Sequence, residues 1–281
     1  MTDDRDRRIA QAFEAHRARV DDVLPTGDRA AIKQLYVEFG ALLEAAAGTD
    51  VDSVPLLSFP EIGPVVAALL DDRRGLVLDA GCGPSPALSL LLAASPDRTV
   101  VSMDISHGSV MLAKERAKQA GARLLPVVGD LEALPFADGV FGGAACEDTI
   151  EHVPDDERGV TELARVMRPD GRLVLTTPNR TRIGVRLLRL KDRLSRRPKS
   201  DEAYYAATSH LREYTWGDLE TLVRRSFDLV RRGSVPWSGG ASARFGSALV
   251  RFAPFRSLGR VVVLDLRPRL THRGAQGSTE A

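Results

Sequence analysis

The sequence has little of what marks an exported or membrane-spanning protein. Its 281 residues include only two cysteines, Cys82 and Cys146, and each lies in an apolar or glycine-rich run that suits a reduced thiol better than a disulfide. The N-terminal MTDDRDRR is not followed by the apolar segment of a signal peptide. No apolar run approaches the roughly 18 residues that a membrane-spanning helix needs. We therefore expect a cytoplasmic protein.

The chain also lacks an excess of either charge, with a net charge of +1 at pH 7. The two signs are nevertheless separated: residues 1–150 contain 14 Lys and Arg against 23 Asp and Glu, a net −9, whereas residues 151–281 contain 25 against 15, a net +10. The near-neutral total makes nucleic acid an unlikely partner. Because 43% of the residues are hydrophobic, the chain can bury one sizeable core, and we expect one domain with insertions.

The basic residues are densest in residues 180–199, where nine Lys and Arg accompany a single acid, Asp192. Apolar and basic residues recur there at helical spacing on adjacent faces: Ile183, Leu187, Leu190 and Leu194 on one, and Arg182, Arg186, Arg189 and Arg193 on the other. The pattern predicts a basic amphipathic helix. Such a helix packs its leucines on the domain as a solvated lid, or it makes peripheral contact with a membrane, an acidic substrate or RNA.

Between residues 75 and 178, short apolar runs alternate with amphipathic segments, from GLVLDA to GRLVLTTP. This alternation predicts an α/β fold with a doubly wound, mostly parallel sheet. Residues 9–48 are rich in alanine and have helical spacing, and residues 1–70 are expected to form a helical preface or cap. The core domain then spans 71–273, with an insertion at 180–214 before the last helix and strands, and 274–281 form a flexible tail.

The first predicted strand ends in the turn LVLDAGCGPSP, where Gly81 and Gly83 permit a tight bend and close approach of the backbone to a ligand. Asp104 ends the second strand 21 residues after Gly83, where a carboxylate can accept hydrogen bonds from both hydroxyls of a ribose. A dinucleotide fingerprint needs a glycine at position 86, but Pro86 stands there. The turn therefore disfavours a pyrophosphate.

Two more acids end neighbouring strands. Asp79 lies two residues before the first glycine, and Asp130 closes the third strand, where it could accept a hydrogen bond from an adenine amino group. Taken singly, each acid is explained as a turn former or a helix cap. Together, three acids around a glycine turn favour a nucleoside that carries a positive sulfonium and ammonium over a pyrophosphate.

The segments LVLDAGCGPSP, VVSMDIS, GDLEALPF and EHVPDDERGVTELARVMRPDGRLVLTTPN resemble the successive motifs of class I S-adenosylmethionine-dependent methyltransferases, over about residues 70–180. The resemblance implies a seven-stranded, Rossmann-like sheet whose last strand is antiparallel. It also implies cofactor contacts: Asp79, Gly81 and Gly83 along the methionine part, Asp104 at the ribose, and Asp130 with Leu131 at the adenine. Ala80, Cys82, Ile105 and Glu147 complete the candidate cofactor-binding residues. Ser85 stands where many members of the family have a third glycine.

The segment CEDTIEHVPDD, residues 146–156, follows the fourth strand and carries five carboxylates and a histidine. If a helical turn begins after Cys146, Asp148, Glu151 and His152 share one face. DTIEH resembles the E-x-x-E-H segment of ubiquinone-biosynthesis O-methyltransferases and of small-RNA 2′-O-methyltransferases. In the RNA enzymes, a second histidine some sixty residues later completes a Mg²⁺ site, and His210 lies 58 residues after His152.

Three interpretations of this segment stay open. Asp148, Glu151, His152 and His210 bind Mg²⁺ or another divalent metal; or His152 and His210 act without metal, one of them as a general base; or the segment is merely the end of a strand. We also expect some of the aromatic residues around the insertion to line an acceptor pocket, namely Tyr204, Tyr205, Tyr214, Trp216 and Trp237.

We predict S-adenosylmethionine-dependent methyl transfer to a hydroxyl of a small molecule, such as a secondary-metabolite, quinone or lipid-like acceptor. His152 and His210 are the predicted catalytic residues. The first alternative is a metal-dependent RNA 2′-O-methyltransferase, and the second is a non-catalytic cofactor-binding scaffold on the same fold.

Overall fold

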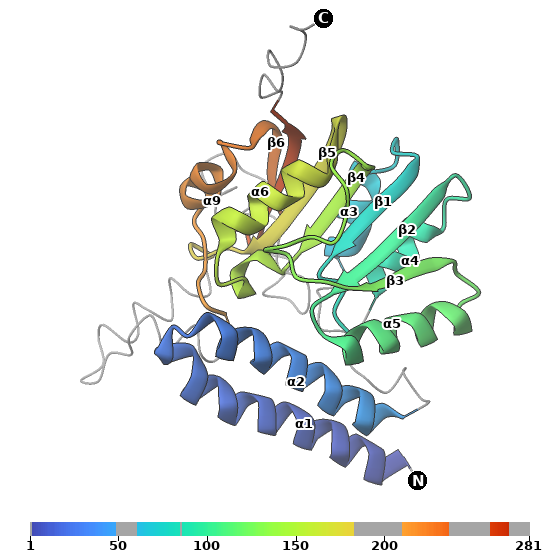
Figure 1. Ribbon diagram of the computed structural model, residues 1–281, viewed down its shortest axis with the longest axis vertical. Coiled ribbons are helices and arrows are strands. Elements are labelled where there is room, and N and C mark those ends of the chain that lie inside the picture. The colour runs from blue at the N-terminus through green and yellow to red at the C-terminus, as the bar shows by residue number, and fades with distance from the viewer. Residues whose placement is uncertain (1, 49–60, 85, 183–209, 236–258, 270–281) are drawn as a thin grey trace, which may run out of the picture.

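A computed structural model describes residues 2–48, 61–84, 86–182, 210–235 and 259–269 (Figure 1). The predicted basic helix lies outside the described residues except for its first three positions, and so do most of the insertion at 180–214 and the tail at 274–281. No helix in the described ranges is both long enough and apolar enough to cross a membrane. Cys82 and Cys146 are buried, and neither forms a disulfide.

The described chain forms a seven-stranded sheet in the order β3-β2-β1-β4-β5-β7-β6. Its strands are β1 (Gly75–Ala80), β2 (Arg98–Asp104), β3 (Leu124–Val128), β4 (Phe141–Glu147), β5 (Met167–Pro178), β6 (Phe227–Val235) and β7 (Val261–Pro268). β1 to β5 pair in parallel, whereas β7 is antiparallel to both β5 and β6. The predicted doubly wound sheet with an antiparallel last strand is confirmed.

Helices cover both faces of the sheet (Figure 1). The helices that follow the cap are α3 (Ile62–Leu69), α4 (Ala87–Ala93), α5 (His107–Gln119), α6 (Asp156–Val166) and α9 (Trp216–Val223). Leu78 of β1 shares an apolar cluster with Leu163 of α6 and Leu219 of α9. Val77, the preceding residue of β1, belongs to a second cluster with Leu92 of α4. Because successive side chains of a strand point to opposite faces, α6 and α9 cover one face and α4 covers the other.

The predicted helical preface forms two helices, α1 (Thr2–Val23) and α2 (Arg29–Ala47), joined by the short 3₁₀ helix η1 (Leu24–Thr26). The two helices lie side by side below the sheet (Figure 1). Asp28 is the N-cap residue of α2, and its side chain accepts hydrogen bonds from the backbone N–H groups of Ala30 and Ala31. Gly27 permits the turn before it, because its φ of 66° lies in the left-handed region.

α2 docks on α5 through two glycines that let the backbones approach. A Cβ atom added at Gly40 of α2 would lie 1.8 Å from the Oγ of Ser106, the N-cap residue of α5. A Cβ atom added at Gly108 of α5 would lie 2.3 Å from the Gly40 carbonyl oxygen. Only glycine fits at both positions, and the contact fixes α2 against the start of α5.

Candidate active site

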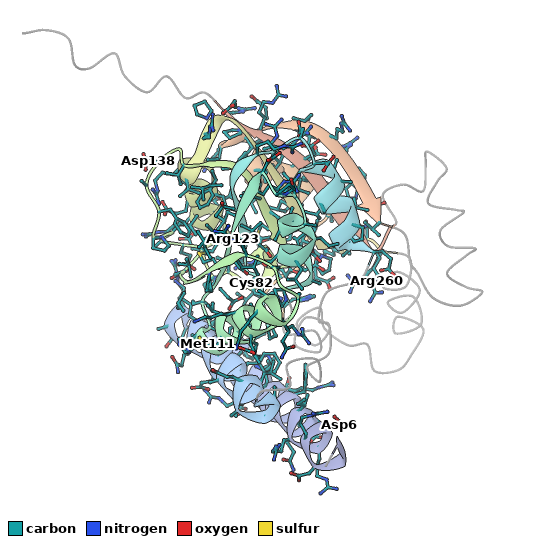
Figure 2. The ribbon with its side chains drawn as sticks, turned by 90° about the vertical axis from the view of Figure 1, so that its right-hand side faces the viewer. Asp6, Cys82, Met111, Arg123, Asp138 and Arg260 are labelled. Atoms are coloured by element: carbon teal, nitrogen blue, oxygen red, sulfur yellow. The ribbon has the colours of Figure 1, made fainter. Side chains whose placement is uncertain are left out.

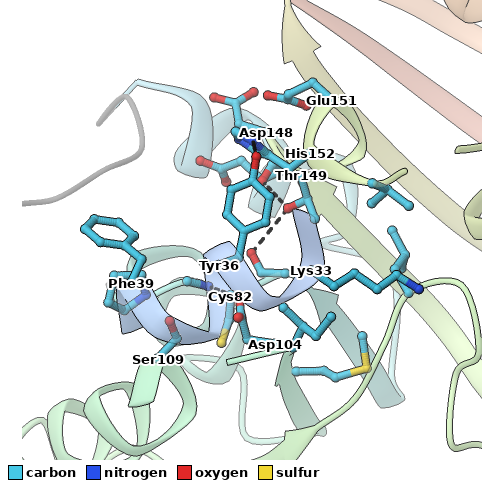
Figure 3. Close-up of a pocket in the computed structure, with 18 of the residues that line it drawn as sticks. Lys33, Tyr36, Phe39, Cys82, Asp104, Ser109, Asp148, Thr149, Glu151 and His152 are labelled. Atoms are coloured by element: carbon cyan, nitrogen blue, oxygen red, sulfur yellow. Dashed lines mark hydrogen bonds between the residues drawn. The ribbon is translucent and has the colours of Figure 1, made fainter. Parts of the chain in front are cut away.

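The carboxyl ends of β1, β2 and β4 and the turn after β3 open into one cavity of about 530 Å³, which α1 and α2 cover. Such a position at the strand ends is where ligands bind in open α/β sheets. Figure 3 shows side chains from the sheet and from α2 meeting in this space. Figure 2 shows Cys82, from the turn after β1, at the end of the sheet nearest the two N-terminal helices.

The turn after β1 is shaped by two glycines with positive φ, Gly81 at 89° and Gly83 at 60°. A Cβ atom at Gly81 would lie 2.3 Å from Thr149 Oγ1, so the strand ends approach too closely for any side chain there. The Gly83 N–H donates to Asp104 Oδ2 (3.0 Å), and the Ser106 N–H donates to Asp104 Oδ1 (2.9 Å). The backbone therefore fixes the Asp104 carboxylate at the edge of the cavity.

Two acids near the ends of β1 and β4 line the cavity: Asp79 is buried and Glu147 is half-buried. Burial raises the pKa of the Asp79 carboxyl to about 6, although a hydrogen bond from Ser89 opposes the shift. Burial, with the nearby charges of Asp148 and Asp79, raises the pKa of Glu147 to about 8. The Oε2 atom of Glu147 is buried and has no hydrogen-bond partner in the described ranges. A cationic ligand group would satisfy these carboxylates.

Asp130 is held from two sides at the other end of the cavity. Its Oδ1 accepts from the Glu132 N–H (2.9 Å), and its Oδ2 accepts from Lys33 Nζ (2.6 Å). Lys33 also donates to Glu132 Oε2 (2.8 Å), and it comes from α2, which the sequence analysis did not connect with the cofactor. The cap is thus ion-paired to the loop that is predicted to hold the adenine.

Glu151, His152 and His210 come together although 58 residues separate the two histidines. One potential ligand atom of each lies within 4.8 Å of the others, and the imidazole ring centroids are 5.0 Å apart. Glu151 is fully buried, and its Oε2 accepts from Thr177 Oγ1 (2.9 Å). Its Oε1 has no hydrogen-bond partner among the residues described. Burial and the charge of Asp148 raise the pKa of Glu151 well above its ordinary value.

Asp148 stands apart from this group. The 3₁₀ helix η3 comprises only Ile150–His152, and Asp148 precedes it with a positive φ of 44°. The helical turn that would place Asp148 on one face with Glu151 and His152 therefore does not begin directly after Cys146. The Asp148 carboxylate instead accepts from Thr176 Oγ1 (3.1 Å), and burial raises its pKa to about 6.

His210 is flanked by a carboxylate that the sequence analysis missed. Its Nδ1 lies 3.4 Å from Glu213 Oε1, in an orientation that makes no hydrogen bond, and Glu213 accepts two hydrogen bonds of 2.8 Å from Arg182. Burial would raise the pKa of Glu213, but His210 and Arg182 outweigh it and lower the pKa to about 2. A small rotation of the imidazole would bring its Nδ1 into hydrogen-bonding distance of this carboxylate.

The cap also supplies Tyr36, whose hydroxyl lies 3.0 Å from His152 Nδ1. Figure 3 shows the Tyr36 side chain directed from α2 toward His152 and Asp148. Lys33 and Tyr36 are three residues apart, so helical periodicity could have predicted that they share one face of α2.

The described aromatic residues near the insertion lie elsewhere. The Tyr214 hydroxyl donates to Asp156 (2.6 Å), and Trp216 packs against the core with Arg232 over its ring. Tyr204, Tyr205 and Trp237 lie outside the described residues. The cavity's aromatic side chains come instead from α1 and α2.

Most of the predicted site residues line this one cavity. They are Asp79, Gly81, Cys82, Gly83, Asp104, Ile105, Asp130, Leu131, Glu147, Asp148, Glu151, His152 and His210. Ala80 is not among the lining residues, because as the last residue of β1 it is buried in the apolar cluster of one face.

Comparisons with known proteins agree with this geometry. Residues 78–175 match the family model of a methyltransferase domain. A malonyl-[acyl-carrier protein] O-methyltransferase of Methylococcus capsulatus is 30% identical over 56% of this chain and 55% of its own length. A ubiquinone/menaquinone biosynthesis C-methyltransferase of Geobacter sulfurreducens is 31% identical over 36% of this chain and 41% of its own. The chain thus spans about half the length of these curated relatives.

The fold has relatives among solved structures. The crystal structure of the [4+2]-cyclase SpnF superimposes with a TM-score of 0.55 and 19% sequence identity, over 74% of this chain and 79% of that one. Residues 78–175 carry a methyltransferase domain, and the family match and the seven-stranded sheet confirm the resemblance to class I methyltransferases seen in the sequence.

Proposed function

We propose that this protein, which carries a class I methyltransferase domain, transfers a methyl group from S-adenosylmethionine to a hydroxyl oxygen of a small molecule. The observation that carries the proposal is the convergence of His152 and His210, with ring centroids 5.0 Å apart, in the same cavity as the glycine turn and its acids. The curated relatives include both O- and C-methyltransferases. A pair of imidazoles supports oxygen as the acceptor atom, because a hydroxyl must lose its proton as it is methylated.

The residues present fit S-adenosylmethionine, which supplies a methyl group on a positively charged sulfur. Glu147, with its unpartnered buried oxygen, and Asp79 would hold the cationic end. Asp104 would accept from the ribose hydroxyls while keeping its two backbone hydrogen bonds, since each carboxylate oxygen can accept more than one. Asp130, already fixed by Lys33, would lie at the adenine.

His210 is the better-supported base of the two histidines. Glu213 beside its Nδ1 would hold the ring and stabilise the proton that Nε2 takes from the acceptor. His152, bonded to Tyr36, would orient the hydroxyl toward the methyl donor, so the chain's main contribution is alignment and removal of one proton.

A divalent metal on Glu151, His152 and His210 is a second candidate for the same step. The buried, unpartnered Oε1 of Glu151 favours it, because a cation would satisfy that atom. Two imidazoles and one carboxylate suit zinc, iron or manganese better than Mg²⁺. A metal there would lower the pKa of an acceptor hydroxyl.

The two remaining alternatives lack support from the described residues. The basic segment that favours RNA lies outside them. A non-catalytic role on the same fold would show itself as cofactor binding without methyl transfer to any acceptor, because fold does not fix function.

Cofactor binding is tested first by substitution of Asp104. Asp104→Ala should weaken S-adenosylmethionine binding in calorimetry by about 1–3 kcal/mol, because it removes a charged acceptor. Asp97→Ala, at an exposed position, is the matched control and should bind as wild type. Tighter binding of NAD than of S-adenosylmethionine would contradict the cofactor assignment.

The base is tested by substitution of each histidine. His210→Ala and His152→Ala should each lower turnover by about 10²- to 10⁴-fold, the range for a lost general acid or base, with cofactor affinity nearly unchanged. His107→Ala, exposed on α5, is the control. Loss of activity with EDTA and recovery with a divalent ion would select the metal version, whereas full activity in EDTA would select the imidazole base. Unchanged turnover in both variants would exclude either role.

A further inference from the structure

An aromatic group from the cap lines the part of the cavity beyond Tyr36. Phe13 and His16 of α1 face Phe39 of α2: the two phenylalanine rings meet edge to face with centroids 5.2 Å apart, and the His16 ring stacks on Phe39 at 4.0 Å and 20°. All three line the same cavity as the cofactor residues. Unlike the acids at the strand ends, the phenylalanines carry no charge, so this region suits an apolar, flat ligand group.

His16 is a buried polar residue with a ring nitrogen that lacks a hydrogen-bond partner among the described residues. Its side chain is only 7% exposed, and its Nδ1 is buried without a hydrogen-bond partner in the described part of the chain. Burial lowers the pKa of His16 to about 4, so the imidazole is neutral at neutral pH. A buried neutral nitrogen without a partner costs free energy unless a ligand or water supplies the hydrogen bond.

A row of neighbouring rings runs from His16 to His210, the proposed base. His16 lies 6.0 Å from Tyr36 between ring centroids, Tyr36 lies 5.2 Å from His152, and His152 lies 5.0 Å from His210. A flat ligand along this row would have one end near His152 and His210 and its other end near His16. Since a hydroxyl can both donate and accept, it pairs with His16 Nδ1 in either tautomer.

We propose that Phe13, His16 and Phe39 form an acceptor subsite for a planar aromatic alcohol, in which His16 Nδ1 hydrogen bonds a second hydroxyl remote from the one that is methylated. The inference rests on the proposed function and names its acceptor class. It makes His16 a specificity-determining residue of the cap. The aromatic rings select planarity, and His16 selects the second polar group.

Binding of defined probes tests the subsite directly. The probes are a naphthol, its fully saturated analogue, and a naphthalenediol with one hydroxyl on each ring, titrated calorimetrically into protein saturated with S-adenosylhomocysteine. The naphthol should bind about tenfold more tightly than the saturated alcohol through its ring contacts. The diol should bind about tenfold more tightly again, the effect of one hydrogen bond to a buried group. The ¹⁵N chemical shifts of the His16 ring should change in NMR spectra when the diol binds.

Variants at His16 separate the two contributions. His16→Phe keeps the stacked ring and should abolish the advantage of the diol over the naphthol. His16→Asn, whose amide replaces Nδ1, should restore part of that advantage. His107→Phe, on the exposed face of α5, is the matched control, and thermal melting checks that each variant folds.

Three results would overturn the inference: equal affinity for planar and saturated probes, a diol advantage that survives His16→Phe, or no binding of any probe. Binding of S-adenosylhomocysteine, measured beforehand, keeps the two proposals apart. If the cofactor product binds and the probes do not, the acceptor class is wrong and the cofactor assignment stands. If neither binds, the proposed function fails as well.

Discussion

At the scale of single residues, Glu147 has the property that a cofactor site for a cation requires. Its carboxyl group is partly buried near Asp148 and Asp79, with Oε2 fully enclosed, and these surroundings raise its pKa from 4.5 to about 8. The ligand-free protein therefore holds a proton there at neutral pH. A cationic ligand beside the group would stabilise the ionised carboxylate, so binding should release that proton.

This predicts that S-adenosylmethionine affinity rises with pH up to about 8, since the bound state holds fewer protons than the free state. Over the same window the ligand-free fold should lose stability as pH rises, because the unfolded carboxyl ionises near 4.5 and the folded one near 8. Calorimetric titrations across this pH range measure the first effect, and thermal melts measure the second. Glu147→Gln should flatten both profiles, whereas the exposed Glu157→Gln should leave them unchanged. An affinity that does not vary with pH would show that no cation approaches Glu147.

Two features of single residues could not be predicted from the sequence: the position of Asp148 and the contact of Glu213 with His210. The spacing of Asp148, Glu151 and His152 predicts a shared face only if the backbone is helical from Asp148 onward. The positive φ of Asp148 depends on how β4 meets the turn after it, which is a tertiary constraint. Glu213 was not predictable for a similar reason: the segment SHLREYTW does not show that Arg182 and His210 lie next to it in the folded protein.

At the scale of elements, the crossing of α2 over α5 positions Lys33 and Tyr36. Both side chains come from α2, and the crossing depends on Gly40, whose neighbours leave no room for a Cβ atom. If this contact were loosened, Lys33 would lose Asp130 and Tyr36 would lose His152. The docking of α2 thus determines whether the cavity is complete.

We predict that Gly40→Ala lowers the free energy of unfolding by about 1–3 kcal/mol, the usual cost of overpacking, although alanine is the better helix former. Gly217→Ala in α9 is the matched control, because the nearest atom to its added Cβ would be 3.9 Å away, and it should be neutral or slightly stabilising. Denaturant unfolding measures both. Equal stability of Gly40→Ala and wild type would mean that α2 does not dock as described.

The elements themselves were largely predictable from the sequence. Short apolar runs such as GLVLDA and the amphipathic segments between them have different periods, and these are set by local backbone geometry. The helical preface was equally predictable, as were the strands expected after the insertion at 180–214, which the structure shows as β6 and β7. That the preface would act as a cap was also expected, but the way α2 docks on α5 was not predictable. The contact through Gly40 and Gly108 involves residues that are far apart in the chain and have no side chain to leave a pattern.

At the scale of the whole molecule, the sheet and the cap supply different residues to the cavity. The strand ends carry the acids and the glycine turn, and their positions follow from parallel strands that all end at one edge. The cap closes the other side with Lys33, Tyr36 and the aromatic group. The residues proposed to bind the cofactor could therefore be picked from the strand ends alone, whereas those on the proposed acceptor side depend on the arrangement of the cap in three dimensions.

The central claim is that this protein methylates an oxygen atom with His210 as the base. The most direct test incubates the protein with S-adenosylmethionine labelled with ¹³C in its methyl group and a panel of naphthols and naphthalenediols, and identifies the labelled product by NMR and mass spectrometry. We predict a labelled methoxy carbon, formed by the wild type and by His107→Ala but at least about a hundredfold more slowly by His210→Ala. A label attached to carbon or nitrogen, or no transfer by a protein that binds the cofactor, would contradict it.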